Sequence, residues 1–93
     1  MADPDADTIR LSLPADVSMR PVVEVAIGVL ARRWGLSDDE VRAARDATGD
    51  ALIELAREGG SDPVQVTVRA SRRRLEVHLA HTASERSILA PPA

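Results

Sequence analysis

Three acidic residues recur at intervals of four in the middle of the chain: Asp46, Asp50 and Glu54. In a helix, residues four apart lie on the same face, so these carboxylates would form one row. Carboxylate oxygens suit hard divalent cations, and the row is therefore compatible with a magnesium or metal site. The alternative is a solvated acidic surface, which the neighbouring Arg42 and Arg57 favour because they can pair with the acids along the helix.

The other reactive residue types form no recognisable site. Cysteine is absent, which excludes disulfides and thiolate metal centres. His78 and His81 fall on opposite faces of a strand, so they are not spaced as two ligands, and no serine has a base beside it in a catalytic pattern. The run Arg72, Arg73 and Arg74 predicts either a contact for an acidic partner or phosphate, or a solubilising turn.

The first two elements follow from hydrophobic periodicity. Residues 8–13 alternate polar and apolar, which predicts a strand with Leu11 and Leu13 on its apolar face. Asp16 or Ser18 can cap the helix that follows. An apolar stripe at helical spacing marks this helix: Val22, Ala26, Val29, Leu30 and Arg33, with Val25 and Trp34 flanking it.

The second helix has the clearest signals. Ser37 and Glu40 form a capping box at its start, and two glycines stop it just after Glu58. Its predicted buried stripe is Val41, Ala44, Thr48, Ala51, Leu52 and Leu55. Two segments of period two, 64–68 and 75–79, predict a hairpin with the arginine run at its turn.

The predicted order is strand, helix, helix, strand, strand. This order favours an α+β two-layer sandwich, with two helices packed on a small three-stranded sheet. Residues 8–80 would form a single domain, between a flexible acidic N-terminus over 1–7 and a flexible C-terminal tail over 81–93. With Trp34 as the one aromatic residue, the core gains little per residue, which favours a dimer or a partner.

Two short motifs connect this chain to a known family. Leu13-Pro14-Ala15 ends the first strand, and Gly35-Leu36-Ser37-Asp38-Asp39 precedes the second helix. In this order and spacing, the segment from Ile9 to Leu79 resembles the N-terminal half of the histidine-kinase/Hsp90-type ATPase domain. The closest similarity is to the bacterial anti-sigma-factor serine kinases.

The resemblance places the acidic row where the family has a catalytic Glu, a magnesium-binding Asn and often a His. Asp46 would keep the carboxylate with a shorter reach, and Asp50 would still ligate magnesium. Asp50 and Glu54 would, however, add negative charge beside a triphosphate. The resemblance therefore implies a degraded nucleotide site.

The second departure from the family lies after the hairpin. The family has an Asp-x-Gly-x-Gly turn there, whose Asp accepts a hydrogen bond from the adenine amino group. This chain has His81-Thr82-Ala83-Ser84-Glu85, with neither the Asp nor the glycines, and leaves no room for the ATP lid. The expectation is that the protein is not an enzyme and has no cofactor.

The leading functional hypothesis is a regulatory protein-binding module in bacterial transcription or signalling control. Its partner would be a sigma factor, an anti-anti-sigma-like protein or a second copy, because the resemblance assigns self-association and sigma contact to the first strand and helix. The candidate contact residues are Leu11, Leu13, Val22, Val25, Arg72, Arg73 and Arg74.

Two other hypotheses stay open. One is a residual Mg-ATP-binding, serine kinase-like protein that a partner chain completes. The other is a regulator that contacts nucleic acid through the arginine run, which the net charge of −3 disfavours. The chain has neither a hydrophobic span nor a secretory leader pattern, so a cytoplasmic protein is expected.

Overall fold

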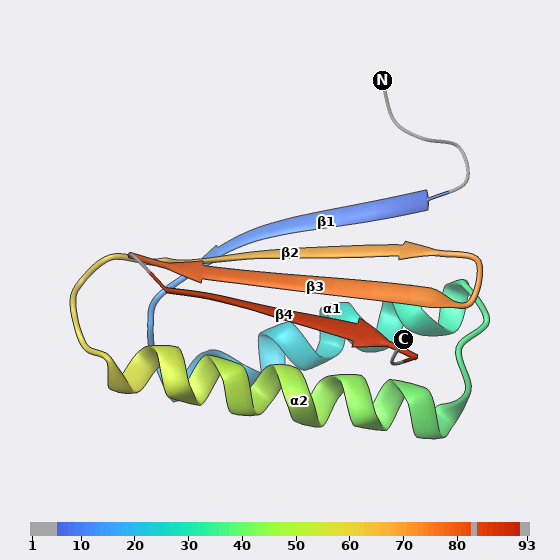
Figure 1. Cartoon of the computed structure of the whole chain (residues 1–93), viewed down its shortest axis with the longest axis horizontal. Coiled ribbons are helices and arrows are strands. Elements are labelled where there is room, and N and C mark those ends of the chain that lie inside the picture. The colour runs from blue at the N-terminus through green and yellow to red at the C-terminus, as the bar shows by residue number, and fades with distance from the viewer. Residues whose placement is uncertain (1–5, 83, 92–93) are drawn as a thin grey trace.

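The computed structural model describes residues 6–82 and 84–91, and it has two layers (Figure 1). The elements in chain order are β1 (Ala6–Leu13), the 3-10 turn η1 (Val17–Met19), α1 (Arg20–Arg33), α2 (Asp38–Arg57), β2 (Val64–Ser71), β3 (Arg74–His81) and β4 (Ser84–Ala90). The strands form one antiparallel sheet in the order β1-β2-β3-β4, and both helices lie on the same side of it. The predicted two-layer α+β class is confirmed.

The sheet has four strands, and the prediction of three is wrong. Ser84–Ala90 pairs with β3 as β4, inside the segment that the sequence pattern leaves as a tail. The pattern fails because Arg86 takes a position on the helix side of the strand, where its guanidinium bonds to Glu54 at 3.2 Å. A long charged side chain can lie along an apolar surface with its polar end in solvent. The inward position is therefore occupied by a charged residue, and the sequence lacks the apolar alternation that would predict a strand.

The helix α1 buries a different row from the one that its sequence spacing favours. Val22, Val25 and Val29 are 44%, 64% and 59% exposed. Apolar residues occur almost all round this helix, so two rows have the spacing of a buried helical face. The sequence alone does not indicate which of the two rows is buried. The row that packs in the core shares Leu30 alone with the predicted stripe: Val23, Ile27, Leu30 and Ala31.

The helix α2 buries its predicted stripe in full, against the inner face of the sheet. Its capping box is confirmed: the Glu40 N–H donates to the Ser37 hydroxyl at 3.2 Å, and the Ser37 N–H donates to the Glu40 carboxylate at 2.8 Å. These signals are local to the sequence, which is why the start of this helix was predictable.

A Ser37→Ala variant is expected to lower the free energy of unfolding by about 1 kcal/mol, because the Glu40 N–H loses its acceptor.

The Ser37 N–H also holds the pKa of the Glu40 carboxyl below its ordinary value. A depressed folded-state pKa gives stability above the ordinary pKa that is lost as the pH falls through the folded value. Urea unfolding at a series of acid pH values measures this contribution. The free energy of unfolding should fall less steeply with decreasing pH in Glu40→Gln than in the parent protein, and the same pH dependence in both proteins would contradict this expectation.

The N-terminal strand is tied to the end of α1. The indole N–H of Trp34 donates to the Asp7 carboxylate at 2.8 Å, and the Arg33 guanidinium lies 2.9 Å from the same group. The strand β1 begins at Ala6, inside the segment 1–7 for which a flexible lead-in is predicted, and residues 1–5 lie outside the described residues. Among the described residues, no helix is both long and apolar enough to cross a membrane.

Candidate functional site

The acidic row lies on the side of α2 that faces away from the core. The side chains of Asp50 and Glu54 are 73% and 59% exposed, and Asp46 is exposed as well. Their neighbours differ, because Asp50 lies 4.0 Å from Arg20 of α1 whereas Glu54 bonds to Arg86 of β4. Asp46 and Glu54 are eight positions apart, which corresponds to about 12 Å along the helix and is too far for one cation. Within the part of the chain that the structure describes, no three carboxylate or imidazole groups gather around a potential metal position.

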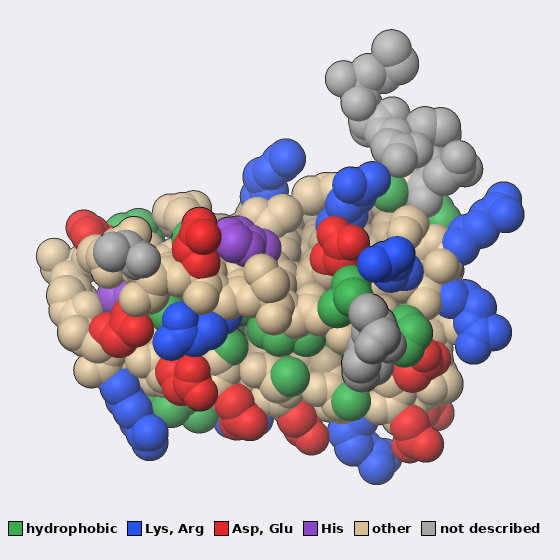
Figure 2. All heavy atoms as spheres, in the orientation of Figure 1, with side chains coloured by type: hydrophobic (Ala, Val, Ile, Leu, Met, Phe, Trp, Pro, Cys, Tyr) green, Lys and Arg blue, Asp and Glu red, His purple; other side chains and the backbone are tan. Residues whose placement is uncertain are grey.

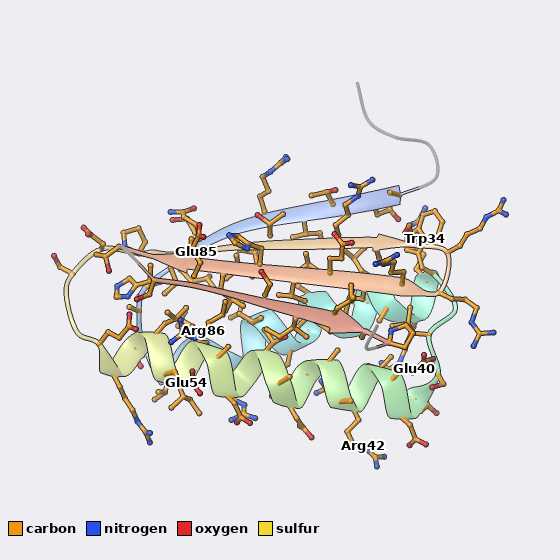
Figure 3. The ribbon with its side chains drawn as sticks, viewed as in Figure 1. Trp34, Glu40, Arg42, Glu54, Glu85 and Arg86 are labelled. Carbon is orange, nitrogen blue, oxygen red and sulfur yellow. The ribbon has the colours of Figure 1, made fainter. Side chains whose placement is uncertain are left out.

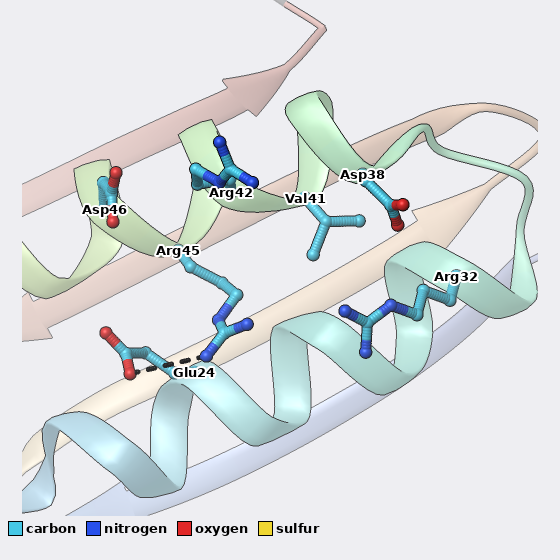
Figure 4. Close-up of a pocket in the computed structure, with 7 residues that line it drawn as sticks. All are labelled: Glu24, Arg32, Asp38, Val41, Arg42, Arg45 and Asp46. Atoms are coloured by element: carbon cyan, nitrogen blue, oxygen red, sulfur yellow. Dashed lines mark ion pairs between the residues drawn. The ribbon is translucent and has the colours of Figure 1, made fainter.

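A charged groove of about 450 Å³ runs between α1 and α2 (Figure 4). Of the acidic row, Asp46 alone lines it. An ion pair crosses it, with Glu24 and Arg45 3.8 Å apart. Three acids and three arginines line it, so the groove offers no concentrated positive potential for a triphosphate. The lining residues are Glu24, Arg32, Asp38, Val41, Arg42, Arg45 and Asp46.

The two helices approach closely at Gly49. The Arg20 side chain of α1 lies across the space that a Cβ at Gly49 would fill. There its Nε donates to Glu24 at 2.9 Å, and this bond is the main cause of the raised pKa of Arg20. Arg20 also lies 4.0 Å from Asp50, the middle member of the acidic row, so this acid contributes to a contact between α1 and α2.

The segment that would hold the family's adenine turn begins at the end of β3 and continues into β4. Within it, His81 and Ser84 are partners across the sheet. His81 is 1% exposed, and its Nδ1 lies 3.9 Å from the Glu58 carboxylate. Neither ring nitrogen has a hydrogen-bond partner among the described residues. The imidazole is thus part of the core rather than of an accessible site.

A His81→Leu variant is expected to raise the free energy of unfolding by about 1 kcal/mol, because it removes two buried polar atoms that lack partners. Urea unfolding at neutral pH measures the change. His78→Leu is the control, since His78 lies exposed on the other face of the same strand. A loss of stability at position 81 would mean that the contact with Glu58 contributes more than its length suggests.

The candidate contact residues do not form one surface. Leu13 is 9% exposed and belongs to the core, and Leu11 is half-buried against it. The predicted arginine run lies at the turn between β2 and β3, where the backbone N–H of Arg73 donates to the Trp34 carbonyl at 2.9 Å and Arg74 lies 3.6 Å from Glu76. The backbone of Arg73 and the side chain of Arg74 therefore make contacts within the fold.

Val22 and Val25 are the predicted contact residues that the structure brings together at the surface. With Val29 they form an exposed apolar row along α1, which we call the valine face. The exposure of Val29 is not evident from the apolar stripe predicted for this helix, although its spacing from Val22 and Val25 is a signal that could have revealed it.

The flank of α1 that carries the valine face approaches β1 at its C-terminal end. Arg33 continues the flank of α1 that carries Val22 and Val29, and it pairs with Asp7 of β1. The strand β1 ends the sheet on this side, so none of the described strands pairs with its outer edge. The apolar helix face and the open strand edge are therefore linked at this end of the helix.

Comparison with models of protein families and with curated proteins gave no match for this chain.

Proposed function

We propose that this protein is a regulatory protein-binding module, a catalytically inactive relative of the anti-sigma-factor/histidine-kinase ATPase domain. It acts by binding a partner in bacterial transcription or signalling control. The partner is a sigma factor, an anti-anti-sigma-like protein or a second copy of the chain. The valine face is the observation that carries this proposal.

Three valines in a row on one helix are costly to leave in water. Burying the exposed part of each stabilises a complex by about 1 kcal/mol. Valine has a stiff side chain and loses little rotamer freedom on contact, so most of this gain is kept. The neighbouring β1 edge can add main-chain hydrogen bonds with a strand of the partner.

The remains of the nucleotide site support an inactive protein. Asp50 and Glu54 lie near different arginines, and the groove that Asp46 lines contains equal numbers of acids and arginines. The buried His81 stands where the family's adenine-binding Asp would be. Each of these features disfavours a bound triphosphate.

Light scattering over a concentration series tests self-association, and capture from a lysate of the host tests a different partner. The proposal expects either a dimer or a captured sigma factor or anti-anti-sigma-like protein. A protein that stays monomeric and captures neither class would contradict it.

A further inference from the structure

The strand β4 forms the second open edge of the sheet. Ser71 and Arg74 are partners on β2 and β3, so two residues link these strands. A two-residue hairpin places a hydrogen-bonded pair beside its turn, so the backbone groups of β3 alternate from there between β2 and β4. Glu85, Ser87 and Leu89 consequently direct their backbone groups away from β3. The Arg86 guanidinium covers the Glu85 carbonyl at 2.9 Å, whereas Ser87 and Leu89 make no backbone bond to any described residue outside the sheet.

An apolar groove of about 370 Å³ runs beside this edge, between β4 and α2. Figure 2 shows apolar side chains between the sheet and the acidic surface of α2. The helix contributes the small side chains of Ala43 and Ala47, and the strand contributes Ile88 and Leu89. Because alternate side chains of a strand point to the same face, a strand added to β4 would direct every second side chain into this groove.

The ends of the groove carry defined charges. Asp39 and Glu40 line one end, and Glu40 lies beside the C-terminal end of β4 (Figure 3). Near the other end, Arg86 reaches Glu54 at 3.2 Å and Glu58 at 3.8 Å, so its positive charge is already compensated. The acids at 39 and 40 are thus the charges that an incoming chain would meet.

These charges distinguish a basic peptide from a second copy of the chain. The helix α2 has six carboxylates and three guanidinium groups. A dimer through this edge would bring two such helices together with like charges opposed. Antiparallel pairing of β4 with itself around Ser87 would also place Leu89 opposite the Glu85 carboxylate.

We propose that the open edge of β4 binds an extended basic peptide segment by strand addition. An aliphatic side chain of the peptide enters the groove, and a basic side chain meets Asp39 and Glu40. This site lies on the opposite edge of the sheet from the valine face, and it does not depend on the function proposed for that face.

The probe is a blocked peptide with the sequence Arg-Thr-Val-Thr-Val-Thr-Arg, titrated into the isotope-labelled protein. We expect amide shifts at Ser87 and Leu89 and at Ala43 and Ala47. The same peptide with Glu at both ends, and a version methylated at alternate backbone nitrogens, should bind at least tenfold more weakly. Absence of binding, or equal binding of the basic and acidic peptides, would overturn the proposal, as would shifts confined to β1 and α1.

Matched variants separate strand addition from a general attraction. Ser87→Pro removes the outward N–H and should weaken the basic peptide at least tenfold, whereas Ser87→Ala keeps that N–H and should bind like the parent. Ala47→Gln should weaken binding by filling the groove, and Asp39→Asn should reduce the preference for the basic over the acidic peptide. Thermal unfolding verifies that each variant is folded, and equal affinities for Ser87→Pro and Ser87→Ala would overturn the proposal.

Discussion

A Val25→Asp variant is expected to lose at least about a hundredfold in affinity for the partner that the valine face binds, which corresponds to about 2.7 kcal/mol. Val25 is the most exposed of the three valines and lies between the other two. A carboxylate there must give up its water when an apolar surface closes over it, and no residue three or four positions away along the helix carries an opposite charge. The measurement is a titration with the captured partner, or sedimentation equilibrium if the partner is a second copy.

The same change should leave the fold intact, because position 25 is 64% exposed. We expect the free energy of unfolding to change by less than about 0.5 kcal/mol. Gln65→Asp is the matched control, since it adds the same charge at an exposed position on β2. If this control weakens binding as much as Val25→Asp does, net charge rather than the valine face governs the interaction.

A Leu52→Ala variant is expected to lose about 3 kcal/mol of stability, because it opens a cavity beneath the sheet. Leu52 is fully buried in the row of α2 that faces the strands. A domain of this size with a mainly aliphatic core has a small reserve of stability, so a large fraction of the variant should be unfolded. Urea unfolding followed by circular dichroism measures the loss.

Two comparisons make the Leu52 result informative. Ile53→Ala removes a similar volume from the next residue, which is half-buried, and should cost less. A bound partner should also restore stability to Leu52→Ala by mass action, since it binds the folded chain alone. Equal losses at positions 52 and 53 would mean that the core is not where the structure places it.

The parts of the fold that the sequence predicts correctly are those with local causes. The capping box at Ser37 and Glu40, the helix it begins and the alternating residues of β2 and β3 depend on neighbours along the chain. The strand β4 was not predictable because the inward position of Arg86 depends on Glu54 of α2, which is distant in sequence. A long-range contact thus supplies what the local pattern lacks.

The candidate sites were harder to predict than the fold. The spacing of Asp46, Asp50 and Glu54 places them on one side of a helix, but it does not tell what lies opposite that side. In α1, apolar residues all round the helix conceal which row is exposed, and the packing of Ile27 against the core decides it. The resemblance named Val22 and Val25 as candidate contact residues, but it did not reveal the exposed row that they form with Val29.

We propose that this protein works through contact with a partner rather than through nucleotide chemistry. Thermal unfolding with and without magnesium and ATP tests it most directly, because a ligand that binds the folded state raises the midpoint. We expect the same midpoint in both conditions for the parent protein. A rise of several degrees that disappears in Asp46→Ala and Asp50→Ala would contradict the claim and support a residual nucleotide site.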